Sequence, residues 1–261
     1  MNMKKLSIYL RYLLEYLKFG DFISVAASVK YVVNHTSHRN DRIIKTTVGT
    51  FFCRKNTNDF QFANYAYEWS VKKYVLDHRQ EYSVFIDGGA CVGEYCILLS
   101  NQNIRCFAFE PVKDTFDVLT KNLELNNLSS VVKAFPFGLG EKNMQVKFVY
   151  NSVNTGASHI ATGSTSGDFL VEIRTFDSLL PELNISPDDH ILFKLDVEGM
   201  EPEALLGATD FIQRYKHITF VMEDKHSGED SIKNTLNAIA PFEFGIVDEF
   251  NIFARKINKI N

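Results

Sequence analysis

The sequence predicts an α/β protein built on a doubly wound, seven-stranded, mostly parallel sheet, and three observations support this fold class. First, strand-like and helix-like segments alternate from residue 83 onward. Second, the first of these strands, 83–87, runs into a glycine-rich turn and then a helix over 93–100. Third, the last two strand-like segments, 242–247 and 250–257, are close enough to form an antiparallel hairpin. Repeated strand–helix units with short apolar strands form parallel sheets covered by helices.

The composition is that of an ordinary globular protein. The chain has 261 residues, 45% hydrophobic and 23% charged, which is enough for a sizeable core. Many of its 22 phenylalanines are expected in that core. The net charge of −4 provides no basic field, so no nucleic-acid partner is expected. The four cysteines form no C-x-x-C pair, so neither a zinc site nor a redox motif is indicated.

Residues 1–80 are predicted to form a helical and β extension that precedes the main domain, 81–261. Apolar residues recur at helical spacing over 3–19, and a second helical stretch follows over 21–34. Two interpretations of the first helix stay open. It packs on the domain or on a partner subunit, which would make a homo-oligomer, or it lies on a membrane surface through residues 1–19.

The rest of the extension is predicted to contain a hairpin and a helix. Residues 42–54 alternate in part around Gly49, which favours two short antiparallel strands. Residues 60–77 follow a turn rich in Asn and Asp and are predicted to form one helix with many aromatic side chains. This helix could cover a cofactor or line an acceptor pocket, or its aromatic rings could simply belong to the core.

The main domain continues the alternation, with one interruption. The expected strands after the first are 104–110, 131–137, 191–196 and 218–223, and the expected helices are 114–126, 201–215 and 231–239. An insertion over about 141–176 contains two segments, 144–150 and 169–176, that alternate like antiparallel strands. They flank a polar loop, 151–168, and loops of this length in a compact domain are usually functional or disordered.

The expected location is cytoplasmic. No apolar run reaches the length of a transmembrane helix. Charged residues interrupt the apolar N-terminal stretch, and no small-residue cleavage site follows it, so a signal peptide is not expected. The four cysteines are expected to be free thiols in a reducing compartment. If the first helix lies on a membrane, the protein is expected at the inner face of that membrane.

The turn between Asp87 and Gly93 carries the strongest chemical signal. Its glycines let the backbone turn sharply and let a ligand lie against bare main chain, beside the free N–H groups of a helix N-terminus. A dinucleotide fingerprint needs G-x-G-x-x-G, but counting from Gly89 places Cys91 and Glu94 at the second and third glycine positions. This disfavours an NAD-linked oxidoreductase. The pattern Asp-x-Gly-x-x-x-Gly resembles the first motif of S-adenosylmethionine-dependent methyltransferases.

A second carboxylate, Glu110, ends the next strand, 23 residues after Asp87. A carboxylate at this place can accept hydrogen bonds from both hydroxyls of a ribose, which suits NAD and S-adenosylmethionine equally. The alternative is an ordinary helix-capping acid before Pro111. At the end of the third strand, Gly138 is expected to contact an adenine, and Phe137 either stacks on that ring or belongs to the core.

Two further carboxylates, Asp196 and Glu198, follow the strand 191–196, where ligands bind in open α/β sheets. A hydroxyl acceptor benefits from a nearby base, and His226 is a third candidate because histidine titrates near neutral pH. Asp196 is also expected to bind the methionine end of the donor. Asp196 and Glu223 have ligand atoms that suit Mg²⁺, but no clear third ligand accompanies them, so no metal is assigned.

Together these segments resemble the FkbM family of methyltransferases. The matching stretches are 85–95, 107–111, 154–158, 174–180 and 193–201. The resemblance covers roughly residues 45–225, and Lys-Leu-Asp-Val-Glu-Gly at 194–199 is its most specific part. Cys91 stands where the family usually has Asn.

The resemblance implies a class I methyltransferase-like fold that transfers a methyl group from S-adenosylmethionine to a hydroxyl of a small molecule or glycan. A module that binds the donor without turning it over is the alternative. The residues expected to bind the donor are Asp87, Gly88, Gly89, Ala90, Gly93, Glu110, Pro111, Phe137, Gly138 and Asp196. The residues expected to act in catalysis are Asp196, Glu198 and His226.

Overall fold

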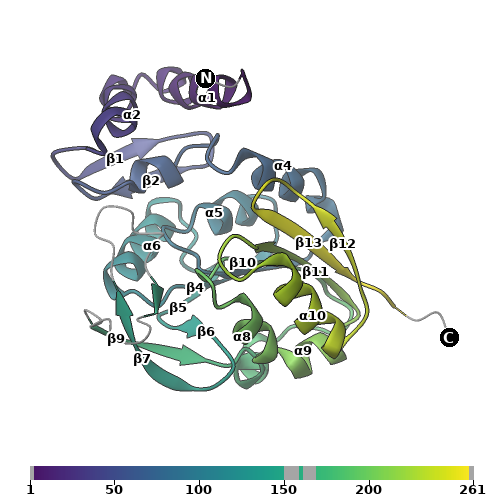
Figure 1. Cartoon of the computed structure of the whole chain (residues 1–261). Coiled ribbons are helices and arrows are strands. Elements are labelled where there is room, and N and C mark those ends of the chain that lie inside the picture. The colour runs from purple at the N-terminus through teal and green to yellow at the C-terminus, as the bar shows by residue number, and fades with distance from the viewer. Residues whose placement is uncertain (1–2, 150–158, 161–168, 259–261) are drawn as a thin grey trace.

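The computed structural model describes residues 3–149, 159–160 and 169–258. Its centre is a seven-stranded sheet with the strand order β12-β13-β11-β10-β3-β4-β5 (Figure 1). In chain order, the strands are β3 (Val84–Gly88), β4 (Arg105–Phe109), β5 (Val132–Phe135), β10 (His190–Leu195), β11 (His217–Glu223), β12 (Phe242–Ile246) and β13 (Asn251–Lys256). The first five run parallel, and β12 and β13 form an antiparallel hairpin at one edge. This confirms the class I methyltransferase-like fold that the sequence predicts.

Helices cover both faces of the sheet, because successive strand residues point to opposite sides. In β3, Phe85 belongs to a core that also contains residues of α4, α5 and α6. Its neighbours Val84 and Ile86 belong to a second core with residues of α8, α9 and α10. The helices are α4 (Trp69–Asp77), α5 (Glu94–Ser100), α6 (Lys113–Leu125), α7 (Leu180–Leu183), α8 (Glu201–Leu206), α9 (Thr209–Arg214) and α10 (Glu229–Ile239). The predicted apolar strands are therefore buried on both faces.

The predicted insertion forms a small second sheet beside the parallel one. Its strands are β6 (Gly138–Leu139), β7 (Met144–Val149), β8 (His159–Ile160) and β9 (Phe169–Arg174). The antiparallel pairing of β7 with β9 confirms the hairpin expected from the sequence. The polar loop predicted for 151–168 lies outside the described residues, apart from β8. The third strand of the main sheet ends at Phe135, two residues earlier than expected, because Gly138 already pairs with β9.

The N-terminal extension contains the predicted helices and hairpin. They are α1 (Met3–Lys18), α2 (Phe22–Asn34), β1 (Arg42–Lys45) and β2 (Thr50–Cys53). The inner face of α1 is tied to the rest of the chain, since the Tyr16 hydroxyl donates to the Phe60 carbonyl and Glu15 accepts a hydrogen bond from the Thr47 hydroxyl at 3.0 Å. No described helix combines the length and the apolar character that a membrane crossing requires.

The prediction of a single helix over 60–77 is wrong for the middle of this segment. The segment forms α3 (Asp59–Phe62) and α4, separated by six residues of turns. Asn64 interrupts the helix, because its side-chain oxygen accepts the Ala66 N–H at 2.8 Å while its side-chain nitrogen donates to the Tyr12 carbonyl at 3.2 Å. Glu68 then has a left-handed backbone, with φ of 46°.

The helix predicted for 201–215 is also divided, into α8 and α9. The division lies at Gly207, where the chain passes very close to the insertion. A Cβ atom at Gly207 would lie 1.9 Å from the carbonyl oxygen of Gly140. Asp177 then accepts the N–H groups of Asp210 and Phe211, both at 2.8 Å, and so caps the first turn of α9.

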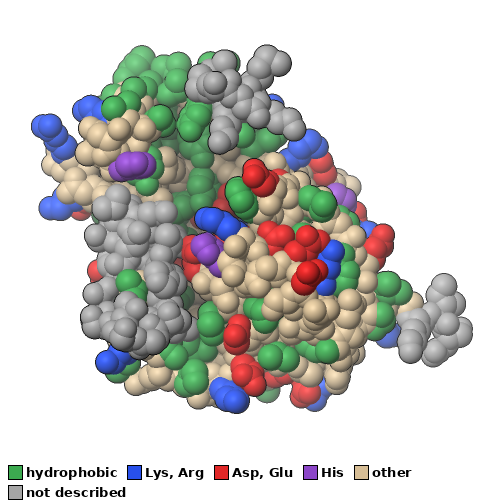
Figure 2. All heavy atoms as spheres, in the orientation of Figure 1, with side chains coloured by type: hydrophobic (Ala, Val, Ile, Leu, Met, Phe, Trp, Pro, Cys, Tyr) green, Lys and Arg blue, Asp and Glu red, His purple; other side chains and the backbone are tan. Residues whose placement is uncertain are grey.

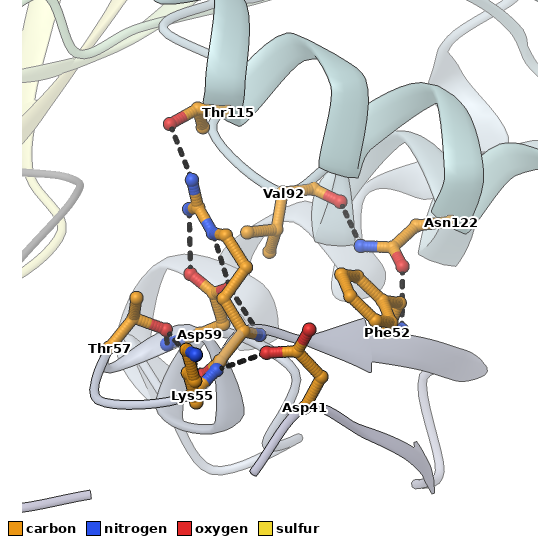
Figure 3. A network of polar contacts seen from close by, with 9 residues as sticks. Asp41, Phe52, Lys55, Thr57, Asp59, Val92, Thr115 and Asn122 are labelled. Carbon is orange, nitrogen blue, oxygen red and sulfur yellow. Dashed lines mark hydrogen bonds and ion pairs between the residues drawn. The ribbon is translucent and has the colours of Figure 1, made fainter. Parts of the chain in front are cut away.

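A network of polar contacts joins the extension to the glycine turn (Figure 3). Asn122, on α6, accepts the Phe52 N–H at 2.7 Å and donates to the Val92 carbonyl at 2.9 Å. Arg54 pairs with buried Asp59 at 2.8 Å, and its guanidinium also reaches α6. One buried amide thus connects β2 with the turn that follows β3.

Replacing Asn122 by Ala is expected to lower the free energy of unfolding by about 1–3 kcal/mol, because a buried N–H and a buried carbonyl would both lose their partner. Urea denaturation followed by circular dichroism measures this change. Glu124→Ala, an exposed position on the same helix, is the matched control and should change stability by less than about 0.5 kcal/mol. Equal stability of Asn122→Ala and the parent protein would contradict the structural role of this amide.

Candidate active site

A cavity of about 530 Å³ opens at the carboxyl ends of the parallel strands. This is the edge at which open α/β sheets bind their ligands. Nine of the residues expected to form the site line it, namely Asp87, Gly89, Ala90, Glu110, Pro111, Gly138, Asp196, Glu198 and His226. The structure therefore brings together residues that lie far apart in the sequence.

Three expected donor-binding residues, Gly88, Gly93 and Phe137, are not among the described residues that line the cavity. Gly88 faces the core, where an added Cβ would meet the Leu195 side chain at 2.8 Å. Gly93 has φ of 86° and is the N-cap residue before α5, so its role lies in the backbone. Phe137 packs 5.4 Å from the Phe135 ring and is almost fully buried, which favours the core alternative for this side chain.

Gly89 is the point of closest approach between the turn and the strand β10. Its φ is 88°, and a Cβ atom there would lie 1.9 Å from the carbonyl oxygen of Asp196. The Asp196 N–H also donates to the Gly88 carbonyl at 2.9 Å. Only glycine fits both the backbone conformation and the contact. The carboxylate of Asp196 is thereby held beside the glycine turn.

Glu110 lies under the turn and is held by main-chain donors. Its two carboxylate oxygens accept the N–H groups of Cys91 at 3.1 Å and of Val112 at 2.8 Å. Burial raises the pKa of Glu110 to about 7, although these two hydrogen bonds and Arg54 act in the opposite direction. Each oxygen can accept a second hydrogen bond, so a fixed carboxylate remains able to bind two hydroxyls of a ligand.

A buried lysine organises the carboxylates at the floor of the cavity. Lys194 donates to Asp196 at 2.8 Å, and burial alone would lower its pKa, but Asp196, Glu68 and Asp87 outweigh burial and raise it. Asp87 is 1% exposed, and its Oδ1 atom has no hydrogen-bond partner among the described residues. Burial raises the pKa of Asp87 to about 6, while Lys194 opposes the shift. This oxygen is itself buried, so Asp87 lies beneath the surface of the cavity floor.

Three titratable side chains meet at the ends of β10 and β11. Glu198, Glu223 and His226 place one ligand atom each within 4.8 Å of one another, a spacing that could hold a metal ion. His226 Nε2 lies 3.3 Å from a Glu198 oxygen. Burial, reinforced by neighbouring carboxylates, raises the pKa of Glu198 to about 8 and of Glu223 to about 7. Both carboxyls are thus stronger bases than usual. The structure adds Glu198 and His226 as neighbours of Glu223, and the charge of Asp196 also acts on the pKa of Glu223.

The extension contributes one wall of the cavity, which the sequence only hinted at. Phe62, Tyr67 and Glu68 line it, and all three come from α3 or from the turns before α4. The Tyr95 hydroxyl donates to Glu68 at 2.8 Å, and buried Lys72 donates to the Tyr67 carbonyl at 2.7 Å. The aromatic composition of 60–77 was the available signal, but it could not identify which rings face the ligand.

Backbone strain is concentrated at this cavity. Eight described residues other than glycine have a positive φ. Five of them are Asn or His, which tolerate this conformation best. The other three are Glu68, Cys91 and Glu198, with φ of 46°, 46° and 53°, and all three line the cavity. Strained backbone of this kind gathers at functional sites.

The family follows from a comparison with known protein domains. A model of the methyltransferase FkbM domain matches residues 87–250, from the end of β3 to the final hairpin. The chain belongs to the FkbM methyltransferase family. The matched range contains the glycine turn, Glu110 and the strand ends that carry Glu198 and Glu223. The resemblance noted from the sequence is confirmed.

Individual relatives agree with this assignment. The hexuronic acid methyltransferase AglP of Haloferax volcanii is 30% identical over 164 residues, which cover 62% of this chain and 64% of that protein. The methyltransferase sdnD of Sordaria araneosa is 27% identical over 155 residues, or 48% of this chain and 60% of that protein. The chain therefore matches less than two thirds of the length of both relatives.

A solved structure with a similar fold is the methyltransferase FkbM of Methylobacillus flagellatus KT. The two chains are 20% identical and superpose with a TM-score of 0.49. The superposed part covers 67% of this chain and 44% of the chain in that structure.

S-adenosylmethionine is the methyl donor of FkbM methyltransferases, and the cavity fits this molecule. Glu110 offers a carboxylate for the ribose hydroxyls, and Gly89 leaves its backbone bare for close approach. Seven carboxyl groups and two lysines line the cavity.

Replacing Glu110 by Gln is expected to weaken donor binding by about 10-fold to 100-fold, because hydrogen bonds from hydroxyls to a charged acceptor would be lost. The affinity of the parent protein should rise as the pH passes about 7, since these bonds favour the ionised carboxylate whose pKa lies there. Calorimetry with S-adenosylhomocysteine across this pH range measures both effects.

Asp114→Asn, an exposed acid early in α6, is the matched control and should keep the parent affinity. The Glu110→Gln variant should also lose the step in affinity near pH 7. An unchanged affinity in that variant would overturn the ribose assignment.

Proposed function

We propose that this protein is an S-adenosylmethionine-dependent O-methyltransferase that acts on a hydroxyl of a glycan or a small molecule. The observation that carries the proposal is the pairing of Glu198 with His226, 3.3 Å apart, at the edge where the donor turn ends. A hydroxyl needs a base as it attacks, whereas an amine needs less assistance. The name of the Haloferax relative, a hexuronic acid methyltransferase, supports a sugar acceptor.

In this proposal the chain positions the acceptor and removes its proton. Bound S-adenosylmethionine supplies a methyl group on a sulfonium, which the acceptor oxygen displaces in line. The Glu198–His226 pair accepts the hydroxyl proton, and the raised pKa of Glu198 strengthens it as a base. Asp196, held by Lys194, is assigned to orient the acceptor beside the donor.

The extension is proposed to form the acceptor side of the pocket. Phe62 and Tyr67 place aromatic rings beside the carboxylate of Glu68 along one wall. Apolar faces next to hydrogen-bonding groups suit a sugar ring, which presents both C–H faces and hydroxyls. Residues 1–80 would then determine acceptor choice, while the domain over 81–261 holds the donor.

The alternative is a module of the same fold that binds the donor without turnover. The family assignment removes the NAD-linked alternative, because the donor of this family is S-adenosylmethionine. The Glu198–His226 pair at the cavity favours turnover over simple binding, because a protein that only binds the donor would not need a general base. Binding of the donor and transfer of its methyl group can be distinguished with a labelled donor.

The test is methyl transfer from a labelled donor to a panel of neutral glycans, glycans containing hexuronic acid, and small polyols. The expected product is a methyl ether, which mild alkali does not cleave. Label released by mild alkali would identify a methyl ester and overturn the hydroxyl assignment. Donor binding with no transfer to any member of the panel would favour the non-catalytic module.

Glu198→Gln and His226→Gln are each expected to reduce turnover by about 10²-fold to 10⁴-fold, because the attacking hydroxyl would lose its base. Donor affinity should stay within about threefold, since neither group is assigned to the donor. Single-turnover kinetics and calorimetry measure the two quantities. Asp230→Asn, an exposed acid on α10, is the control and should match the parent.

Parent-like turnover in both variants would contradict the assignment of the base. A parallel reaction with EDTA addresses the other use of the same side chains. Activity that is lost with the chelator and restored by Mg²⁺ would assign Glu198, Glu223 and His226 to a metal ion instead.

A further inference from the structure

The outward side of α1 is apolar, although nothing in the described chain covers it. Leu10, Leu14 and Leu17 are 55%, 54% and 44% exposed. Their spacing of four and three residues places them on one stripe of the helix. The opposite side of α1 is the one that packs on the protein, through Glu15 and Tyr16. The apolar stripe therefore lies on the side of the helix that faces away from the protein.

The second helix repeats this pattern. Phe22, Val29 and Val33 of α2 are 71%, 53% and 77% exposed and also recur at helical spacing. The two helices contact each other, and Figure 2 shows apolar side chains gathered over them at the top of the molecule. An apolar patch spread over two helices exceeds the scattered hydrophobic residues of an ordinary surface. We name this surface the outer helical face. It is formed by the exposed apolar side chains of the two helices, which include Leu10, Leu14, Leu17, Phe22, Val29 and Val33.

The charge of the two helices differs from that of the whole chain. Residues 3–34 contain five basic residues, Lys4, Lys5, Arg11, Lys18 and Lys30, and two acidic residues, Glu15 and Asp21. Both acids have partners within the protein, and so do two of the basic residues: Arg11 lies 4.9 Å from the centre of the Trp69 ring, and Lys18 donates to Thr47 at 2.9 Å. Glu15 accepts the Thr47 hydroxyl, and Asp21 pairs with Arg42 at 2.9 Å. Residues 3–34 therefore have three more basic than acidic residues, whereas the chain as a whole has a net charge of −4.

We propose that the outer helical face binds the surface of an anionic lipid bilayer. Helices that lie in a bilayer interface combine an exposed apolar stripe with flanking lysine and arginine. Charge complementarity selects this occupant over a second copy of the chain, because two copies meeting here would bring their positive charges together. The helices lie on the membrane and do not cross it, in agreement with their length and composition.

Docking in this way would hold the cavity near the membrane. Tyr12, on the inner side of α1, accepts a hydrogen bond from Asn64, in the segment between α3 and α4 that forms the cavity wall. One helix layer therefore separates the outer helical face from that wall. An acceptor linked to a lipid could then reach the site, an extension that rests on the proposed function. Binding of the outer helical face to a bilayer does not depend on the proposed function.

The test is co-flotation of the full chain with vesicles, either phosphatidylcholine alone or phosphatidylcholine mixed with phosphatidylglycerol. The parent protein is expected to float with the anionic vesicles and to bind less as salt increases. A double variant, Leu14→Gln with Val33→Asn, adds no charge and should reduce binding by about tenfold or more. Ile246→Asn, 75% exposed on β12, is the matched control and should bind like the parent.

Calorimetry with S-adenosylhomocysteine checks that each variant is folded, and sedimentation without lipid reports its oligomeric state. A parent that stays with the unbound fraction would overturn the proposal, as would a double variant that floats like the parent. A parent dimer that the double variant converts to a monomer would identify a second copy as the true occupant. Failure of methyl transfer would leave the flotation result unaffected.

Discussion

The contact between Gly89 and the carbonyl of Asp196 is the constraint on which the site depends. It brings the backbone of the glycine turn against the end of β10, at a distance no side chain would permit. The neighbouring hydrogen bond from the Asp196 N–H to Gly88 fixes the same junction. As a result, the turn assigned to the donor and the carboxylates assigned to the acceptor occupy one rigid edge of the sheet. The 2.8 Å contact of Lys194 with Asp196 then orients the carboxylate that this junction places there.

The extension and the main domain are joined at the same place. Asn122 receives the Phe52 N–H from β2 and gives a hydrogen bond to Val92 in the turn. Phe62 and Glu68 reach the cavity from the other end of the extension. A change in the extension therefore has two routes to the site, one through the main chain of the turn and one through the cavity wall.

The sequence predicted the parallel sheet, its closing hairpin and the pairing of the inserted strands, because alternating apolar patterns are local and regular. It could not predict the break in the helix over 60–77, since Asn64 bonds to Tyr12, 52 residues away. Phe137 had two equal roles in the sequence, and only its packing on Phe135 places it in the core. The meeting of Glu198 with His226 likewise depends on two neighbouring strands ending at the same level. The residue types were visible in advance, and their distances were not.

The left-handed backbone at Glu68, Cys91 and Glu198 has a consequence for how this protein can change. Each such position costs on the order of 1–3 kcal/mol, and glycine would remove that cost. It would also remove a side chain that faces the cavity. Stability and the lining of the cavity are therefore linked at these three positions. Engineering toward a more robust protein should begin at exposed positions distant from the cavity, where the two properties are independent.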